Sequence, residues 1–179
     1  RAISMALGIV ALGIYMTLRR DSFYVASAER IPILKLVVGN MLIWHIFAIY
    51  AIKFLSSGRA AILGYTMPVW ALLIGVLFYQ SALTWRGSLG VLLALTATLL
   101  LAIEEFTSLI GQPLGLGLML LAAFGWGLGT VMMNHTQLSI SNTALTFWMM
   151  VATVPVLAAV SLLLEASQWR SPTIGEWMA

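Results

Sequence analysis

Residues 56–70 read SSGRAAILGYTMPVW and combine a cation, small residues, two glycines and a proline at the start of an apolar run. Arg59 stands where this run enters the bilayer, and there a charge reaches headgroups or water at modest cost. We interpret it as an interfacial anchor. Ser56 and Ser57 precede it, and serine at the start of a helix accepts hydrogen bonds from the first N–H groups. The stretch therefore predicts a capped helix that begins at the membrane surface.

Pro68 lies about two turns inside this predicted helix. A proline ring removes one backbone hydrogen bond and clashes with the carbonyl four residues earlier, here that of Gly64. At membrane depth a carbonyl without a partner is tolerated only where protein covers it or where it lines a wet cavity. Two interpretations stay open: a kink that serves the packing of neighbouring helices, and a kinked helix that wraps a central cavity.

The rest of the chain is more apolar than soluble domains are. Of its 179 residues, 61% are hydrophobic and 8% are charged, whereas soluble domains carry about a quarter charged residues. Because an open strand would leave backbone groups unpaired in lipid, each apolar segment is predicted to be a helix. As a helix, the segment that contains Pro68 is about 31 Å long, close to the bilayer core of about 30 Å. The six apolar segments are residues 2–18, 33–52, 60–80, 87–103, 114–133 and 143–164.

These segments predict an all-α integral membrane protein, a polytopic bundle of about six transmembrane helices. The spacing Gly125-x-x-x-Gly129 predicts one closely packed helix face, because small residues let helix backbones approach in lipid. The expected location is the bacterial inner (plasma) membrane, crossed several times.

The charges and motifs argue against several other classes of protein. The nine Lys and Arg residues stand one or two at a time between apolar runs, so the net charge of +3 does not indicate a nucleic-acid partner. There is no cysteine, which excludes disulfides and thiolate metal sites. GxSxG, HExxH and Walker motifs are absent as well. We therefore expect no catalytic residue, no metal and no cofactor, and as partners the lipid bilayer and a small-molecule substrate. A homodimer is left open.

Residues 56–102 read SSGRAAILGYTMPVWALLIGVLFYQSALTWRGSLGVLLALTATLLLA and resemble the EamA-like family of the drug/metabolite transporter superfamily. Small-Gly-x-Ala, the proline of TMPVW and LTWRG-x-x-G follow in the family's order. The resemblance implies ten helices in two five-helix repeats of inverted topology around a central cavity. It makes the chain an internal fragment: residues 1–103 are helices two to five of the first repeat, and residues 104–179 are helices six and seven and the start of eight. In one departure, Gln80, Ser81 and Ala82 stand where the family often has Gly-Glu-Arg.

Four side chains are candidates for binding a substrate. His45 lies mid-span, and two interpretations stay open. It is either a neutral histidine hydrogen-bonded to a neighbouring helix, or a group that contacts substrate or accepts a proton. Tyr65 and Met67 flank the kink and suit a cavity for varied organic solutes. Trp126, inside FGWGLG, lies too deep for an interfacial tryptophan. The resemblance implies that the middles of helices three, four and six line the cavity, and these four residues occupy the matching positions.

Gly64 and Pro68 complete the predicted site as the kink or gate, and Asn40 and Trp44 are second choices on the His45 helix. The sequence thus predicts a transporter, an exporter of small organic metabolites such as amino acids, that works by alternating access. The alternative from another class is a membrane-embedded subunit or enzyme whose catalytic groups lie outside this fragment.

Overall fold

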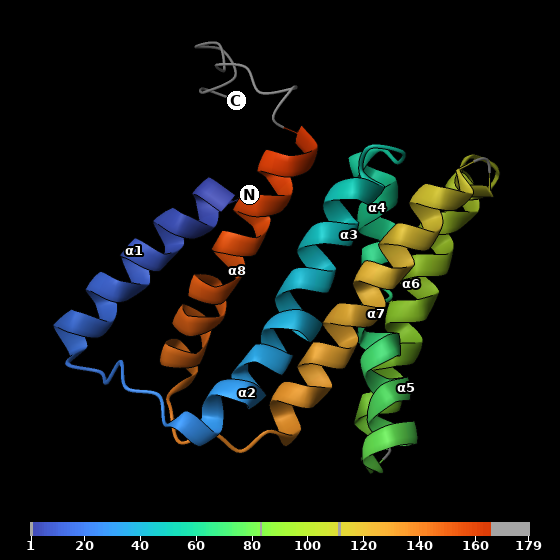
Figure 1. The fold of residues 1–179 in the computed structure, drawn as a ribbon. Coiled ribbons are helices and arrows are strands. Elements are labelled where there is room, and N and C mark those ends of the chain that lie inside the picture. Colours follow the sequence, from blue (N-terminus) through green and yellow to red (C-terminus); the bar gives the residue numbers. More distant parts are fainter. Residues whose placement is uncertain (1, 83, 111, 166–179) are drawn as a thin grey trace.

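The computed structural model describes the backbone of residues 2–82, 84–110 and 112–165, and the side chains of these residues except 101–102, 104–110 and 165. Within this part of the chain the ordered elements are helical, and they run side by side as a bundle (Figure 1). They are α1 (Ala2–Arg19), α2 (Ser27–Leu36), the π-helical segment η1 (Val37–Leu42), α3 (Ile43–Ala51), α4 (Ser57–Gly64), α5 (Met67–Tyr79), α6 (Trp85–Ile110), α7 (Pro113–His135) and α8 (Asn142–Glu165).

Several elements join into longer membrane-spanning units. α2, η1 and α3 form one apolar span, and α4 with α5 forms a second. In the described residues, five helices are long and apolar enough to cross a membrane, and Trp85–Leu100 of α6 is a shorter apolar stretch. The prediction of an all-α bundle is thereby confirmed, and against the predicted six or so spans the described residues show five to six helices of spanning length. The residues expected to begin an eighth family helix lie outside the described part.

Two predicted boundaries were wrong. The fourth apolar segment was predicted to end at residue 103, but the backbone of α6 continues to Ile110. The second span was predicted to begin after Pro32, but α2 begins at Ser27 and contains this proline as its sixth residue. The hydrogen bond that a proline cannot donate would have gone to the carbonyl four residues earlier, at Ala28. That residue lies in the exposed first turn, where water can satisfy a helix end. Proline is therefore tolerated here although it ended the predicted segment.

Helix α7 packs between two of these spans, and its glycines make the contacts. A Cβ atom at Gly125 would overlap the Ile43 side chain, and one at Gly129 would lie 2.5 Å from the Cα of Asn40. On another side of α7, a Cβ at Gly127 would lie 2.8 Å from the backbone N of Ala71 in α5. These distances are too short for any side chain, so the predicted small-residue face is confirmed, and a third glycine extends the contact to α5.

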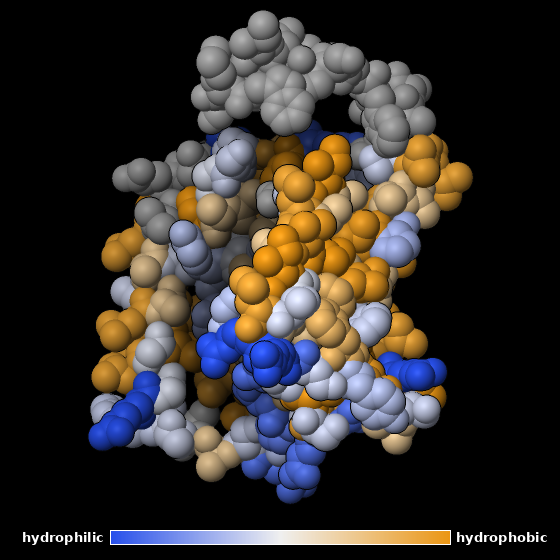
Figure 2. Space-filling view, turned by 90° about the vertical axis from the view of Figure 1, so that its left-hand side faces the viewer, coloured by the Kyte–Doolittle hydropathy of each residue, from blue (hydrophilic) through white to orange (hydrophobic). Residues whose placement is uncertain are grey.

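The outer surface of the bundle is apolar. On α1, for example, Ile3, Leu7, Val10 and Ile14 are exposed. Figure 2 shows the side of the bundle nearest α1: hydrophobic side chains cover its upper part and hydrophilic ones gather toward its lower end. A helix face of this kind is covered by lipid or by other helices, since water would oppose its exposure.

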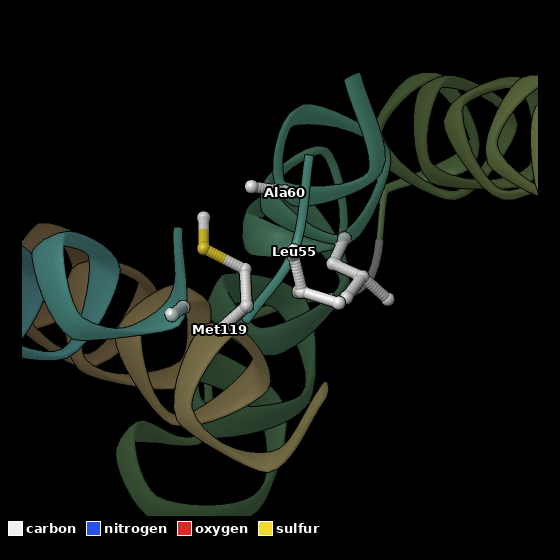
Figure 3. Packing of buried hydrophobic residues seen from close by; sticks show 5 residues of the cluster. Leu55, Ala60 and Met119 are labelled. Atoms are coloured by element: carbon white, nitrogen blue, oxygen red, sulfur yellow. The ribbon is translucent and has the colours of Figure 1, made fainter. Parts of the chain in front are cut away.

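A compact cluster of buried side chains joins α7 to the connection between α3 and α4. Met119 extends from α7 beside Leu55 and Ala60, and Ala51 and Leu63 complete the cluster (Figure 3). All five are less than a tenth exposed. This cluster holds the second half of α3, the whole of α4 and the first half of α7 together.

Candidate functional site

The span that contains Pro68 is interrupted where the sequence predicted it. α4 ends at Gly64 and α5 begins at Met67, so that the interruption lies at Tyr65 and Thr66. The Thr66 hydroxyl and backbone N–H both donate to the Leu63 carbonyl, at 2.7 and 3.1 Å, and close a tighter turn. Pro68 then lies in the first turn of α5, where the N–H that it lacks is not needed. The regular helix is thus interrupted beside Pro68, and the role of Gly64 and Pro68 as a kink or gate stays a prediction.

The predicted cap is present as well. Ser56 is the N-cap of α4, and its hydroxyl oxygen accepts a hydrogen bond from the backbone N–H of Arg59 at 3.4 Å. α4 thus begins directly after this cap, at Ser57, and its eight residues run to the interruption.

A cavity of about 290 Å³ lies beside this interruption. α3 and α4 form most of its wall, Met67 enters from α5, and Met119 enters from α7. Four residues predicted from sequence are among those that line it: His45, Gly64, Tyr65 and Met67. The other lining residues are Trp44, Ala48, Ile49, Ile52, Ala60, Ala61 and Met119.

Trp126 is not among the lining residues of this cavity. Its ring lies behind that of Trp44, with ring centroids 5.5 Å apart and an interplanar angle of 66°. This is the edge-to-face arrangement that aromatic pairs favour. Trp126, on α7, therefore packs against the Trp44 ring of α3. Trp44, a second choice in the sequence prediction, is the tryptophan that lines the cavity. Asn40, the other second choice, is buried against Gly129.

His45 is half-buried and its ring is fixed from its own helix. Its Nδ1 lies 2.8 Å from the Met41 carbonyl oxygen, one turn earlier. Because a carbonyl only accepts, Nδ1 donates in this contact and carries a proton. This contact leaves open whether the His45 ring also bonds to a neighbouring helix. The interpretation as a group at the cavity fits its position on the wall.

The cavity wall contains no Asp, Glu, Lys or Arg among the described residues. Its polar groups are the His45 imidazole, the Tyr65 hydroxyl and the Trp44 indole, set among alanine, isoleucine and methionine side chains. The Tyr65 side chain is 60% exposed, so the cavity opens to the surroundings beside it. Across the described residues, no group of three or more His, Cys, Asp and Glu could hold a metal ion. The arrangement suits the binding of an organic molecule through packing and a few hydrogen bonds.

Sequence reasoning missed Met119 as a cavity residue. Met119 comes from α7, and nothing in its local sequence shows which neighbour it faces. The predicted small-residue spacing did show that α7 packs closely. Ala48 and Ile52, also missed, lie one and two turns after Trp44 on the same helix face, a signal that helical periodicity could have supplied.

Apolar spans with a cavity of about 290 Å³ between them define the class: a multi-pass α-helical membrane protein. The sequence profile of the EamA-like transporter family matches residues 1–103, more than half of the 179, and the chain belongs to this family. The resemblance seen in the sequence is thereby confirmed. The family consists of membrane transporters, which is consistent with a protein that is not an enzyme. No curated protein and no solved structure matches the chain.

Proposed function

We propose that the protein exports small organic metabolites, such as amino acids, by alternating access around the cavity beside the α4–α5 interruption. Membership of the EamA-like transporter family gives the class of activity. The observation that carries the proposal is the meeting of Gly64, Tyr65, Met67 and His45 at one cavity of about 290 Å³. A volume of this order is at the lower end of small-molecule sites, which run from about 300 Å³.

The wall supplies two kinds of contact for such a solute. The Tyr65 hydroxyl and the His45 imidazole act as hydrogen-bonding groups. Trp44, Met67 and Met119 provide a ring face and two flexible thioethers that adapt to different shapes. Together they would orient the polar end of a solute toward His45 and Tyr65 and pack its apolar part against the other three.

The interruption at Tyr65 and Thr66 is the proposed gate. Two short helices joined by a turn can change their mutual angle with few broken hydrogen bonds, because the turn already lacks the regular ladder. Movement of α5 against Gly127 of α7 would then open one side of the cavity and close the other. In the proposed architecture the chain contributes to two inverted five-helix repeats, residues 1–103 to the first and 104–179 to the second.

The proposal places the protein in a bacterial inner membrane, with the bilayer as its surroundings and a small molecule as its partner. A homodimer is compatible with it and is not required, since the cavity is lined from within one chain.

The function is tested by a thermal-shift screen of the full purified protein against amino acids, nucleosides and sugars. We expect one class to stabilise the protein, and cells that produce the protein to export members of that class. Tyr65→Ala should remove both effects while the protein still reaches the membrane. Tyr24→Ala is the matched control, because Tyr24 is 74% exposed and does not line the cavity.

If no class stabilises or is exported, the transport proposal fails. If a bound solute is instead converted to a product, the membrane-embedded enzyme or subunit is the better description.

A further inference from the structure

We propose that Gly64 is a selectivity residue: with Trp44, Met67 and Met119 it forms a floor of the cavity that admits an uncharged apolar or aromatic group of limited size. This inference rests on the proposed transport function and names the chemistry of the solute at the same site. Met119 and the size limit at Gly64 were not part of the site predicted from sequence.

Three side chains converge on Gly64 from three other helices. A Cβ atom built on Gly64 would lie 3.2 Å from the Cε of Met119, 3.5 Å from the Cη2 of Trp44 and 3.6 Å from the Cε of Met67. These atoms belong to α7, α3 and α5, and each of the three residues lines the cavity. Because Gly64 has no side chain, a solute in the cavity can reach the side chains of Met119, Trp44 and Met67.

The backbone itself does not require glycine at this position. No glycine among the described residues has a positive φ, so an alanine at residue 64 would keep a conformation that any L-residue adopts. Helix interiors also favour alanine over glycine. What glycine provides here is close approach of the three side chains, whereas a Cβ at Gly58, in the same helix, would meet no atom within 4 Å.

The chemistry of the floor selects against charge. The two methionine thioethers and the tryptophan ring are apolar and polarisable, and no formal charge stands among the described lining residues. A charged group that leaves water for this surface would lose its hydration without gaining a partner ion. An uncharged ring would gain dispersion contacts and sulfur–aromatic contacts. We therefore infer a solute whose aromatic or apolar end enters the floor and whose polar groups face Tyr65 and His45.

The charge rule is tested with three probes of one shape: benzyl alcohol, benzoate and benzylammonium, added to the full purified protein at neutral pH. Binding is measured by calorimetry, and titration of each probe into protein-free detergent micelles gives the background from probe that enters the detergent. We expect benzyl alcohol to bind at least about tenfold more tightly than either ion. Equal or tighter binding of benzoate overturns the inference, and so does equal or tighter binding of benzylammonium, which would show that the Trp44 face attracts cations.

The size rule is tested with benzyl alcohol and the larger 1-naphthalenemethanol. Gly64→Ala should lower the affinity for the larger probe about tenfold more than for the smaller one, as one methyl group in a fitted pocket does. Gly58→Ala should change neither. The double variant with Gly64→Ala and Met119→Ala should regain affinity for the larger probe, because the shorter side chain at position 119 makes room for the new methyl group at position 64.

The single variant Met119→Ala provides a second test of the size rule, and this test does not require that Gly64→Ala folds. It should raise the affinity for 1-naphthalenemethanol relative to benzyl alcohol. If Gly64→Ala affects both probes equally and Met119→Ala does not favour the larger one, Gly64 is a packing residue and the inference is wrong. That result would leave export by the unmodified protein untouched, whereas loss of export by the unmodified protein refutes the transport proposal itself.

Discussion

Asn40 and Gly129 approach so closely that a Cβ atom at Gly129 would lie 2.5 Å from the Cα of Asn40. Asn40 belongs to η1, the π-helical turn within the second span, and Gly129 belongs to α7. Here a helix with an irregular hydrogen-bond pattern meets another helix backbone to backbone. π-helical turns are rare and are often found at functional sites. The cavity begins one turn further along this span, at Trp44 and His45.

Gly129→Ala should destabilise the protein by about 1–3 kcal/mol, since the added methyl group would force two backbones apart. Gly117→Ala is the control on the same helix, because a Cβ there meets nothing within 4 Å. This control should be neutral or slightly stabilising. Thermal unfolding of the purified protein measures both, and equal melting temperatures for the two variants would show that the Asn40–Gly129 contact is not as tight as described.

Pro68→Ala should reduce transport without loss of folding. The substitution allows residue 68 to donate to the carbonyl of Gly64 and to join α4 and α5 into a straighter helix. We expect equal or higher thermal stability together with slower export in cells. Export at the normal rate would mean that the interruption serves packing only, the first of the two interpretations that the sequence left open.

Trp126→Ala should weaken solute binding about tenfold although Trp126 does not line the cavity, because its ring holds that of Trp44 through an edge-to-face pair. Trp126→Phe should retain most of the affinity, since a smaller ring can still supply the contact. Trp85→Ala is the matched control, as Trp85 is 80% exposed. The stabilising solute class from the thermal-shift screen serves as the probe, and full affinity in Trp126→Ala would remove the supporting role.

Ser56→Ala should destabilise the protein by about 1 kcal/mol through loss of the N-cap of α4. Ser57→Ala serves as the comparison one residue further, because Ser57 is the first residue of α4 and the cap of this helix is Ser56. Unfolding temperatures of the two variants separate the effects. A larger loss for Ser57→Ala would contradict the assignment of Ser56 as the cap.

Much of the fold could be predicted from the sequence because membrane spans leave strong local signals. The length of the apolar segments predicted the spans, and Pro68 predicted the interruption. The spacing of Gly125 and Gly129 predicted a packed face on α7. These properties depend on residues close together in the chain. The start of α2 was missed because a proline six residues into a helix removes a single hydrogen bond, here the one to Ala28 in the exposed first turn.

The π-helical turn η1 and the cavity floor were beyond local reasoning for a different reason. η1 differs from an α-helix by the choice of hydrogen-bond partner, and no side chain in VVGNML specifies that choice. The floor joins Trp44, Gly64, Met67 and Met119, which come from four helices. Which residue of α7 faces Gly64 depends on how the helices are rotated against each other, and this follows from packing across the whole bundle.

The central claim is that a cavity open to water and solute lies beside the interrupted helix, and cysteine accessibility tests it most directly. The 179 residues contain no cysteine, so a single introduced thiol is read without background from this region. Ala48→Cys places a thiol on the cavity wall, and Val10→Cys places one on the exposed apolar face of α1. We expect a small, uncharged, water-soluble thiol reagent to label Ala48→Cys and not Val10→Cys, because the reactive thiolate forms only in contact with water. The stabilising solute should slow the labelling. Absence of labelling at Ala48→Cys, in the presence of normal folding, would contradict the account.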